Sequence, residues 1–282
     1  MSAVTDTATG IPRPTGRPHF GQKASDALVM TWRQLLQTIR VPDLLVFATI
    51  QPIMFVLLFA YVFGGAIPIS DGNYKEYLVP GIFVQTVAFT TVATSIGLAE
   101  DLKKGLIDRF RSLPMARSAV LFGRTLGDSA RNILVLFVMS VCGLIVGWRI
   151  RDGVLSAIAA YALILFFGYG MSWVGAFFGL IVSSPEAANN LGFIWLFPLT
   201  FVSNLFVPVE GMPDWLQTVA EWNPISAIAA AVRDLFGNPT APTPGDLPFP
   251  LEHAVPVSVC WCVIILAVFV PLSVRKYRNT SH

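Results

Sequence analysis

Six apolar runs divide the sequence, and each has about the length of a helix that crosses a lipid bilayer. A transmembrane helix needs about 20 mostly apolar residues. The runs lie at 44–64, 78–99, 128–147, 154–182, 187–209 and 254–274. Hydrophobic residues make up 54% of the chain and charged residues only 13%, against about a quarter in an ordinary soluble domain. We therefore predict an all-α polytopic membrane protein with six transmembrane helices, formed by residues 41–278.

Lys and Arg are distributed unevenly between the two sides of these runs. Of the 19 basic residues, fifteen precede the first run, lie between the second run and the start of the third (Arg131 included), or follow the last. Connections rich in Lys and Arg stay in the cytoplasm. We therefore expect a protein of the plasma or inner membrane with both termini cytoplasmic, including a disordered tail at 1–23 and a short tail at 279–282. The basic cluster at 103–131 is also compatible with contact to anionic lipid or nucleic acid, although a net charge of +2 gives no support to a nucleic-acid partner.

Residues 24–40 predict an amphipathic helix ahead of the first run. Apolar side chains such as Trp32 and Leu36 recur at helical spacing, and Arg33 and Arg40 lie on the opposite face. A helix of this kind lies along the membrane surface. A plain surface anchor explains the pattern fully, and a role in transmitting movement is the alternative.

A second amphipathic segment, at 100–117, joins the second and third runs. Leu102, Phe110 and Leu113 belong to one apolar stripe, charged residues cover the other side, and Pro114 ends the helix. Because the segment lies between two spans, displacing it would move both of them. A solvated linker that packs on the bilayer is an equally good interpretation of the pattern.

The apolar runs contain almost no ionisable side chains. Arg131, near the start of the third run, is the exception that we identify in their cores. Ion-coupled transporters place an ionisable group in the membrane, so this class is disfavoured. The three histidines lie outside the runs, which disfavours a metal site, a haem site or an intramembrane protease. No G-x-x-x-x-G-K-[ST] loop occurs, so we expect no cofactor on this chain, and ATP and magnesium would be bound by another polypeptide.

Uncharged polar and aromatic residues within the runs are candidates for the lining of a solute pathway. Such a lining accepts an amphiphilic, partly aromatic solute. The candidates are Gln51, Gln85, Phe89, Thr90, Trp173, Phe193, Phe201 and Asn204. Hydrogen bonds between helices are the alternative role for the polar members of this set.

The connection after the fifth run predicts two short external helices within 212–236. Pro213 can open the first, and Asn223 followed by Pro224 can cap and open the second. The second is apolar yet too short to cross a bilayer, so it would re-enter the outer leaflet or lie on it. Arg233 and Asp234 near its end are expected to pair with each other.

Several of these segments together resemble the ABC-2-type exporter membrane subunits, in the branch typified by daunorubicin/doxorubicin-resistance permeases. The resemblance covers about residues 24 to 278. It rests on the helix before the first run and on three motifs: L-V-P-G-I-F-V-Q-T, G-L-I-D-R-F-R-S-L-P-M-A-R, and F-V-S-N-L-F-V-P-V-E-G-M-P-D-W-L-Q followed by N-P-I-S. The resemblance implies the type V exporter fold and a non-catalytic permease subunit, whose pair works with two copies of a separate ATPase.

The resemblance also implies roles for the two cytoplasmic helices. The segment at about 102–113 would be the coupling helix that docks on the ATPase, and 24–40 the connecting helix beside it, with Trp32, Arg33 and Leu36 on it. The ATPase contacts would be made by Glu100, Leu102, Lys104, Gly105, Arg109, Phe110 and Leu113. The helices within 212–236 would be the external re-entrant pair.

The function that this resemblance implies is ATP-driven efflux of a hydrophobic or amphiphilic solute, such as a drug or natural product, with antibiotic resistance as one outcome. Export of a lipid or a polysaccharide is the alternative within the family. A membrane-embedded enzyme, a lipid-handling scaffold without transport, and a secondary transporter are the alternatives outside it.

Overall fold

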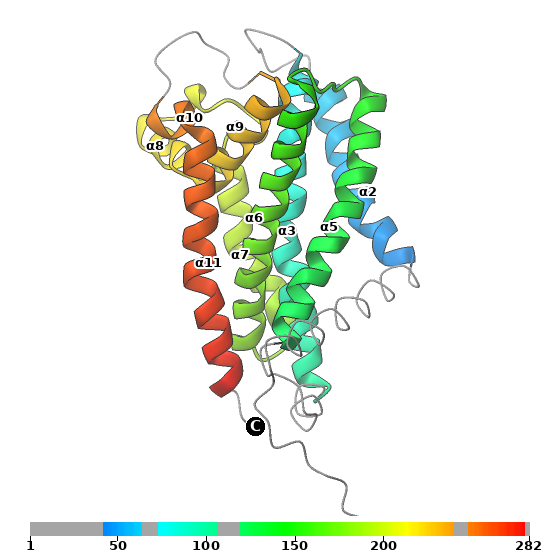
Figure 1. Cartoon of the computed structure of the whole chain (residues 1–282), viewed down its shortest axis with the longest axis vertical. Helices are drawn as coiled ribbons and strands as arrows, with labels where there is room; N and C mark the ends of the chain where they lie inside the picture. The colour runs from blue at the N-terminus through cyan, green and yellow to red at the C-terminus, as the bar shows by residue number, and fades with distance from the viewer. Residues whose placement is uncertain (1–41, 64–72, 106–118, 240–247, 280–282) are drawn as a thin grey trace, which may run out of the picture.

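A bundle of long helices forms the body of the protein (Figure 1), and the computed structural model describes residues 42–63, 73–105, 119–239 and 248–279. The described residues contain no strand. The long helices are α2 (Pro42–Leu58), α3 (Tyr74–Lys103), α5 (Ala119–Val146), α6 (Gly153–Ile181), α7 (Pro185–Phe201) and α11 (Ala254–Asn279). The short helices are α8 (Asp214–Glu221), α9 (Pro224–Phe236) and α10 (Phe249–Glu252). The prediction of a helical membrane protein is therefore confirmed.

Four of the long helices are long and apolar enough to cross a membrane: α3, α5, α6 and α11. Helix α2 has 17 residues and continues through Phe59–Phe63 as a π-helix. Helix α7 also has 17 residues. All six apolar runs thus contain a helix, and four of these helices have the length of a membrane span.

The helix of the fifth run, α7, ends earlier than predicted, at Phe201 instead of 209. The side-chain amide of Asn223 donates hydrogen bonds to the main-chain carbonyls of Leu199 and Val202 at 2.7 and 2.6 Å. The last carbonyls of a helix have no partner within the helix, so this amide satisfies them where the chain leaves α7. Residues 202–208 then continue without helical structure.

Helix α3 lies in the middle of the bundle, and α6 approaches it closely. A Cβ atom added at Gly179 would lie 2.7 Å from the main-chain oxygen of Ser95, and one at Gly175 would collide with the main-chain oxygen of Thr91. Real Cβ atoms do not approach backbone oxygens this closely, so the two helices meet at this separation only because both positions are glycine.

The short helices α8, α9 and α10 gather at one end of the bundle (Figure 1). Asn223 caps α9, as its sequence predicts, by accepting a hydrogen bond from the amide of Ile225 at 2.9 Å. Gly237 ends the helix with φ +68°. At the same end the Arg151 guanidinium donates hydrogen bonds to both carboxylate oxygens of Glu76, the shortest from Nη2 to Oε1 at 2.6 Å. This hydrogen bonding raises the pKa of the Arg151 guanidinium.

Arg233 in α9 does not pair with Asp234, so this prediction is wrong. The guanidinium is fully buried and donates to three main-chain carbonyls, those of Tyr77, Asn204 and Leu205, at 2.7 to 2.9 Å. It also lies 3.6 Å from the centre of the Tyr77 ring. Asp234 is exposed. Neighbouring residues on a helix point about 100° apart, so one faces the bundle and the other faces outward.

The opposite end of the bundle contains the end of α3, the start of α5 and the end of α11 (Figure 1). These elements border two of the three chain regions whose basic residues we assigned to one side, the connection between the second and third runs and the segment after the last run. Among the described residues, this end includes Lys103, Lys104, Arg275, Lys276 and Arg278. The uneven distribution of charge along the sequence therefore corresponds to one end of the fold.

Candidate functional site

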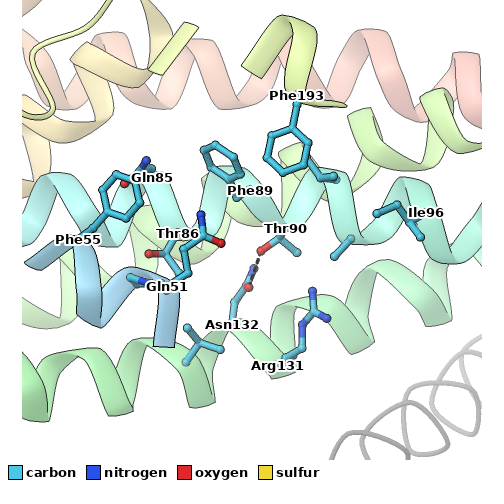
Figure 2. A pocket seen from close by; sticks show the side chains of 14 residues that line it. Gln51, Phe55, Gln85, Thr86, Phe89, Thr90, Ile96, Arg131, Asn132 and Phe193 are labelled. Carbon is cyan, nitrogen blue, oxygen red and sulfur yellow. Dashed lines mark hydrogen bonds between the residues drawn. The ribbon is translucent and has the colours of Figure 1, made fainter. Parts of the chain in front are cut away.

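A cavity of about 320 Å³ lies among α2, α3, α5 and α7 (Figure 2). Its volume is near the lower end of the range of small-molecule pockets, which is about 300–1,000 Å³. Each of the four helices contributes side chains to its wall. The lining residues are Gln51, Pro52, Phe55, Gln85, Thr86, Phe89, Thr90, Val92, Ala93, Ile96, Arg131, Asn132, Val135 and Phe193.

Helix α3 provides the longest wall, because its lining residues follow the helical repeat. Gln85, Phe89 and Ile96 are separated by about one and two turns, so they lie along one face of the helix. Helix α2 contributes residues 51–55, and α7 contributes Phe193. The wall therefore depends on packing among segments that are far apart in the sequence.

One part of the wall is polar, and most of its hydrogen bonds join α3 to α5. The Thr90 hydroxyl donates to the Asn132 side-chain oxygen at 2.8 Å (Figure 2). One turn further along α3, Thr94 donates to an oxygen of Asp128 at 2.6 Å. The side-chain amides of Gln51 and Gln85 have no hydrogen-bond partner among the residues that the structure describes. These two amides are therefore available to a solute.

The other part of the wall is aromatic. The ring of Phe89 lies 5.9 Å from that of Phe193 and 5.7 Å from that of Phe197, measured between centres. The contacts continue beyond the cavity through Phe201 and on to Phe206, with centres 5.7 and 5.5 Å apart. From there Phe59 and Phe55, at 4.7 and 5.9 Å, lead back to the cavity wall. Aromatic rings at these distances attract one another and offer flat apolar surface to a ligand.

The structure brings five of the eight pathway candidates together at this cavity: Gln51, Gln85, Phe89, Thr90 and Phe193.

The other three candidates lie elsewhere. Trp173 is buried against Phe122, with ring centres 4.8 Å apart, and Phe201 is half exposed on α7. Asn204 is buried, and its main-chain oxygen accepts hydrogen bonds from Tyr77 and Arg233. None of these three residues lines the cavity, and contact between any of the eight candidates and a solute stays a prediction.

Sequence reasoning missed Phe55 and Asn132 as lining residues, and it noted Arg131 only as an exception. The third run was expected to start at 128, whereas α5 starts at Ala119. Placed inside a longer helix, Arg131, Asn132 and Val135 share one face, and this spacing is the signal that could have found them.

The structure describes only the first residues of the segment predicted as the coupling helix, so this helix stays a prediction. Helix α3 includes Leu102 and ends at Lys103. The exposed ion pair between Glu100 and Lys104, at 3.1 Å, spans one turn of this same helix end. Gly105 then adopts φ +64°, which ends the helix.

The remaining predicted coupling and connecting residues lie outside the described part of the chain. They are Trp32, Arg33, Leu36, Arg109, Phe110 and Leu113.

Polar contacts between α3 and α5 connect the cavity with this end of α3. The pairs Thr90–Asn132 and Thr94–Asp128 lie at and beside the cavity. Nearer the end of α3, Arg124 donates to Asp101 at 2.6 Å. The two helices are thus held together by three polar contacts along about three turns of α3, so a displacement of its end is shared with α5.

Long apolar helices around a partly polar cavity define a polytopic helical membrane protein. Residues 26–236 match the family described as ABC-2 type transporter. The chain is 36% identical over 265 residues to the daunorubicin resistance ABC transporter permease protein of Streptomyces coeruleorubidus, covering 94% of this chain and 90% of that protein. It is 26% identical over 204 residues to the doxorubicin resistance ABC transporter permease protein of Mycobacterium tuberculosis, covering 72% and 70% of the two chains. The chain therefore belongs to the ABC-2 type transporter family.

Membership in this family confirms the resemblance found in the sequence motifs. It implies a permease subunit that works with an ATPase partner and has a non-catalytic role. The described helices and the cavity thus belong to the membrane part of a transporter.

Proposed function

We propose that this chain is the permease subunit of an ABC exporter that moves a hydrophobic or amphiphilic solute, such as a drug or natural product, out of the cell. The observation that supports this most is the cavity, whose wall contains both the rings of Phe89 and Phe193 and the side-chain amides of Gln51 and Gln85, which have no partner among the described residues. An amphiphilic solute matches both surfaces. The relatives are named for resistance to daunorubicin and doxorubicin, and this supports a drug-like solute.

The proposed topology has six crossings of the plasma or inner membrane, with both termini in the cytoplasm. Helix α2 with its π-helical continuation spans 22 residues, or about 33 Å at 1.5 Å per residue, and α7 spans about 26 Å. The hydrocarbon core is about 30 Å thick, so α7 fits with slight thinning or with its ends buried in protein. The basic residues at one end of the bundle support the cytoplasmic assignment of that end. Helices α8 and α9 would then be the external pair, with α9 re-entering the outer leaflet.

The proposed assembly contains two copies of this chain and two ATPase subunits, which bind the ATP and magnesium. The contact with the ATPase would be made by the segment that follows Gly105, with the exposed Glu100 and Lys104 beside it. Closure of the ATPase pair would displace this segment and the end of α3. The polar contacts between α3 and α5 would then carry the displacement to the cavity.

The decisive experiment is reconstitution of the chain with its ATPase subunit in proteoliposomes and measurement of ATP-dependent movement of doxorubicin, used as a fluorescent probe. Transport requires both subunits and ATP under this proposal. Phe110→Asp should abolish copurification with the ATPase, whereas Thr218→Asp, at an exposed position of α8, should retain it. Transport by the chain alone, or in ATP-free vesicles driven by an ion gradient, would contradict the proposal and favour a secondary transporter. Export of a lipid or a glycan, with no movement of doxorubicin, would favour the alternative solutes.

A further inference from the structure

The cavity wall contains a cation, Arg131, whose environment differs from that of the other described arginines. Arg131 is the twelfth residue after the start of α5, so it lies about 18 Å along a helix that is a candidate membrane span, near the start of the third apolar run. Its guanidinium extends from α5 toward α3 at the cavity (Figure 2). A charged side chain inside a membrane is costly, and such residues generally mark solute or ion pathways.

The positive charge of Arg131 is only weakly compensated. The nearest carboxylate, Asp128, is 4.0 Å away, and the other oxygen of that carboxylate accepts the short hydrogen bond from Thr94. Among the described residues, no carboxylate lines the cavity. By contrast, Arg124 and Arg151 each lie 2.6 Å from a carboxylate.

The guanidinium of Arg131 therefore has unused hydrogen-bonding capacity. A guanidinium has five N–H donors, and within the described residues none of those of Arg131 is engaged in a hydrogen bond. Even Arg233, which has no carboxylate partner, donates to three carbonyls. A guanidinium with free donors, in a place of low polarity, favours a carboxylate, sulfonate, phosphate or ionised phenol.

The rest of the wall limits the molecule that can present such a group. The rings of Phe55, Phe89 and Phe193 offer flat apolar surface, and the amides of Gln51 and Gln85 offer neutral hydrogen bonds. A volume of about 320 Å³ suits a small fused-ring body better than a pair of acyl chains.

We propose that Arg131 makes this cavity a binding site for aromatic solutes that carry an acidic group, with the acid on the guanidinium and the rings against the phenylalanines. The inference rests on the proposed function, because it names the class of solute that the transporter binds. It assigns Arg131 as a specificity-determining residue. The same guanidinium also suits the phosphate of an anionic lipid, so the experiment distinguishes the two sources.

The test compares two dyes with one ring skeleton. The dye 8-anilinonaphthalene-1-sulfonate carries a sulfonate, and N-phenyl-1-naphthylamine lacks it. Each is titrated by fluorescence into the full permease–ATPase complex in phosphatidylcholine nanodiscs without ATP, and the signal of empty nanodiscs is subtracted. We expect Arg131→Gln to weaken binding of the sulfonate dye about tenfold or more, since a hydrogen bond to a charged group is lost. Binding of the neutral dye should change less than twofold.

Two further variants control for charge and folding. Arg131→Lys retains the cation and should recover part of the affinity for the sulfonate dye. Arg275→Gln removes an exposed charge at the end of α11 and should leave both affinities unchanged. Equal weakening of the two dyes by Arg131→Gln would overturn the inference in favour of a structural role. An unchanged affinity for the sulfonate dye would overturn it as well.

The alternative ligand, an anionic lipid, is tested by adding phosphatidic acid to the nanodiscs. Under our inference, phosphatidic acid displaces the sulfonate dye only weakly, because it lacks the aromatic body. Tight, Arg131-dependent retention of phosphatidic acid together with no difference between the dyes would assign the site to lipid and overturn the proposed solute class. Failure of ATP-dependent movement of both doxorubicin and the sulfonate dye would instead count against the proposed function, because dye binding without ATP is measured independently of transport.

Discussion

Replacing Arg233 by Met should destabilise the protein, because the guanidinium joins α9 to α3 and to the segment after α7. Its three hydrogen bonds, to the carbonyls of Tyr77, Asn204 and Leu205, have lengths of 2.7 to 2.9 Å. The Asn204 oxygen also accepts from the Tyr77 hydroxyl at 2.6 Å, so it keeps a partner in the variant. The Leu205 oxygen has no other hydrogen bond among the described residues.

The loss can be estimated from these contacts. Leaving the Leu205 carbonyl unsatisfied costs about 1–3 kcal/mol, and each of the other two lost bonds about 1 kcal/mol. The contact with the Tyr77 ring adds about 2 kcal/mol at a buried site. Replacing the buried cation by an apolar side chain also removes the cation's desolvation penalty, which offsets part of this loss of stability. We therefore expect Arg233→Met to lower the free energy of unfolding by about 3 kcal/mol.

The assay is unfolding of the purified chain in mixed micelles of dodecyl maltoside and increasing SDS, followed by tryptophan fluorescence. The matched control is Asp234→Asn, because Asp234 is the exposed neighbour on the same helix. Surface substitutions usually change stability by less than about 0.5 kcal/mol. A loss below about 1 kcal/mol for Arg233→Met would refute the reasoning, because the lost hydrogen bonds and ring contact would then not outweigh the desolvation penalty of the buried cation. Equal losses for the two variants would show that an Arg233–Asp234 ion pair matters after all.

Further variants test helix contacts in the same unfolding assay. Gly179→Leu should lower the free energy of unfolding by more than about 2 kcal/mol, because even its Cβ meets the main-chain oxygen of Ser95 and must push α6 away from α3. Gly211→Ala, at an open position, should change it little. Equal effects of the two variants would disprove the close approach. Asn223→Asp should lower the free energy of unfolding by about 2 kcal/mol, at least as much as Asn223→Ala does, because the aspartate still caps α9 but cannot donate hydrogen bonds to the end of α7. An unchanged free energy of unfolding in Asn223→Asp would show that the cap alone matters. Phe193→Ala should weaken binding of both naphthalene dyes by a similar factor, about fivefold, since it removes apolar surface without charge; selective loss of one dye would contradict this.

Much of the fold follows from patterns along the sequence. The apolar runs predict the helices, since length and hydropathy alone determine which segments cross a bilayer. The Asn223–Pro224 pair predicts the start of α9, because capping depends on the two residues themselves. Gly175 and Gly179, at which α6 approaches α3, have the G-x-x-x-G spacing that is typical of close helix contacts.

The features that were predicted wrongly depend on partners far away in the chain. The end of α7 is set by the amide of Asn223, which is more than twenty residues further along. Arg233 donates hydrogen bonds to carbonyls of α3 and of the segment after α7 and does not pair with its neighbour Asp234. No local sequence pattern shows that these carbonyls can accept hydrogen bonds.

The cavity was predicted only in part for a related reason. Residue type identified Gln51 and Phe89 as candidates, but residue type cannot show which side of a nearly uniform apolar helix faces a cavity. Helix α3 is apolar on most of its circumference, so periodicity gives little orientation. Trp173 is aromatic, like the cavity residues Phe89 and Phe193, but it is buried in a different cluster.

Under the proposed topology, helix α3 joins the two faces of the membrane. It runs for 30 residues, or about 45 Å, from Tyr74 to the exposed Lys103. Arg233 of α9 donates to the main-chain oxygen of Tyr77 near one end of this helix, and to those of Asn204 and Leu205 after α7. A displacement of the other end, at Lys103, would therefore reach α9 and the segment after α7 through direct hydrogen bonds, so that the cytoplasmic and external helices of the proposed exporter would be coupled through one helix.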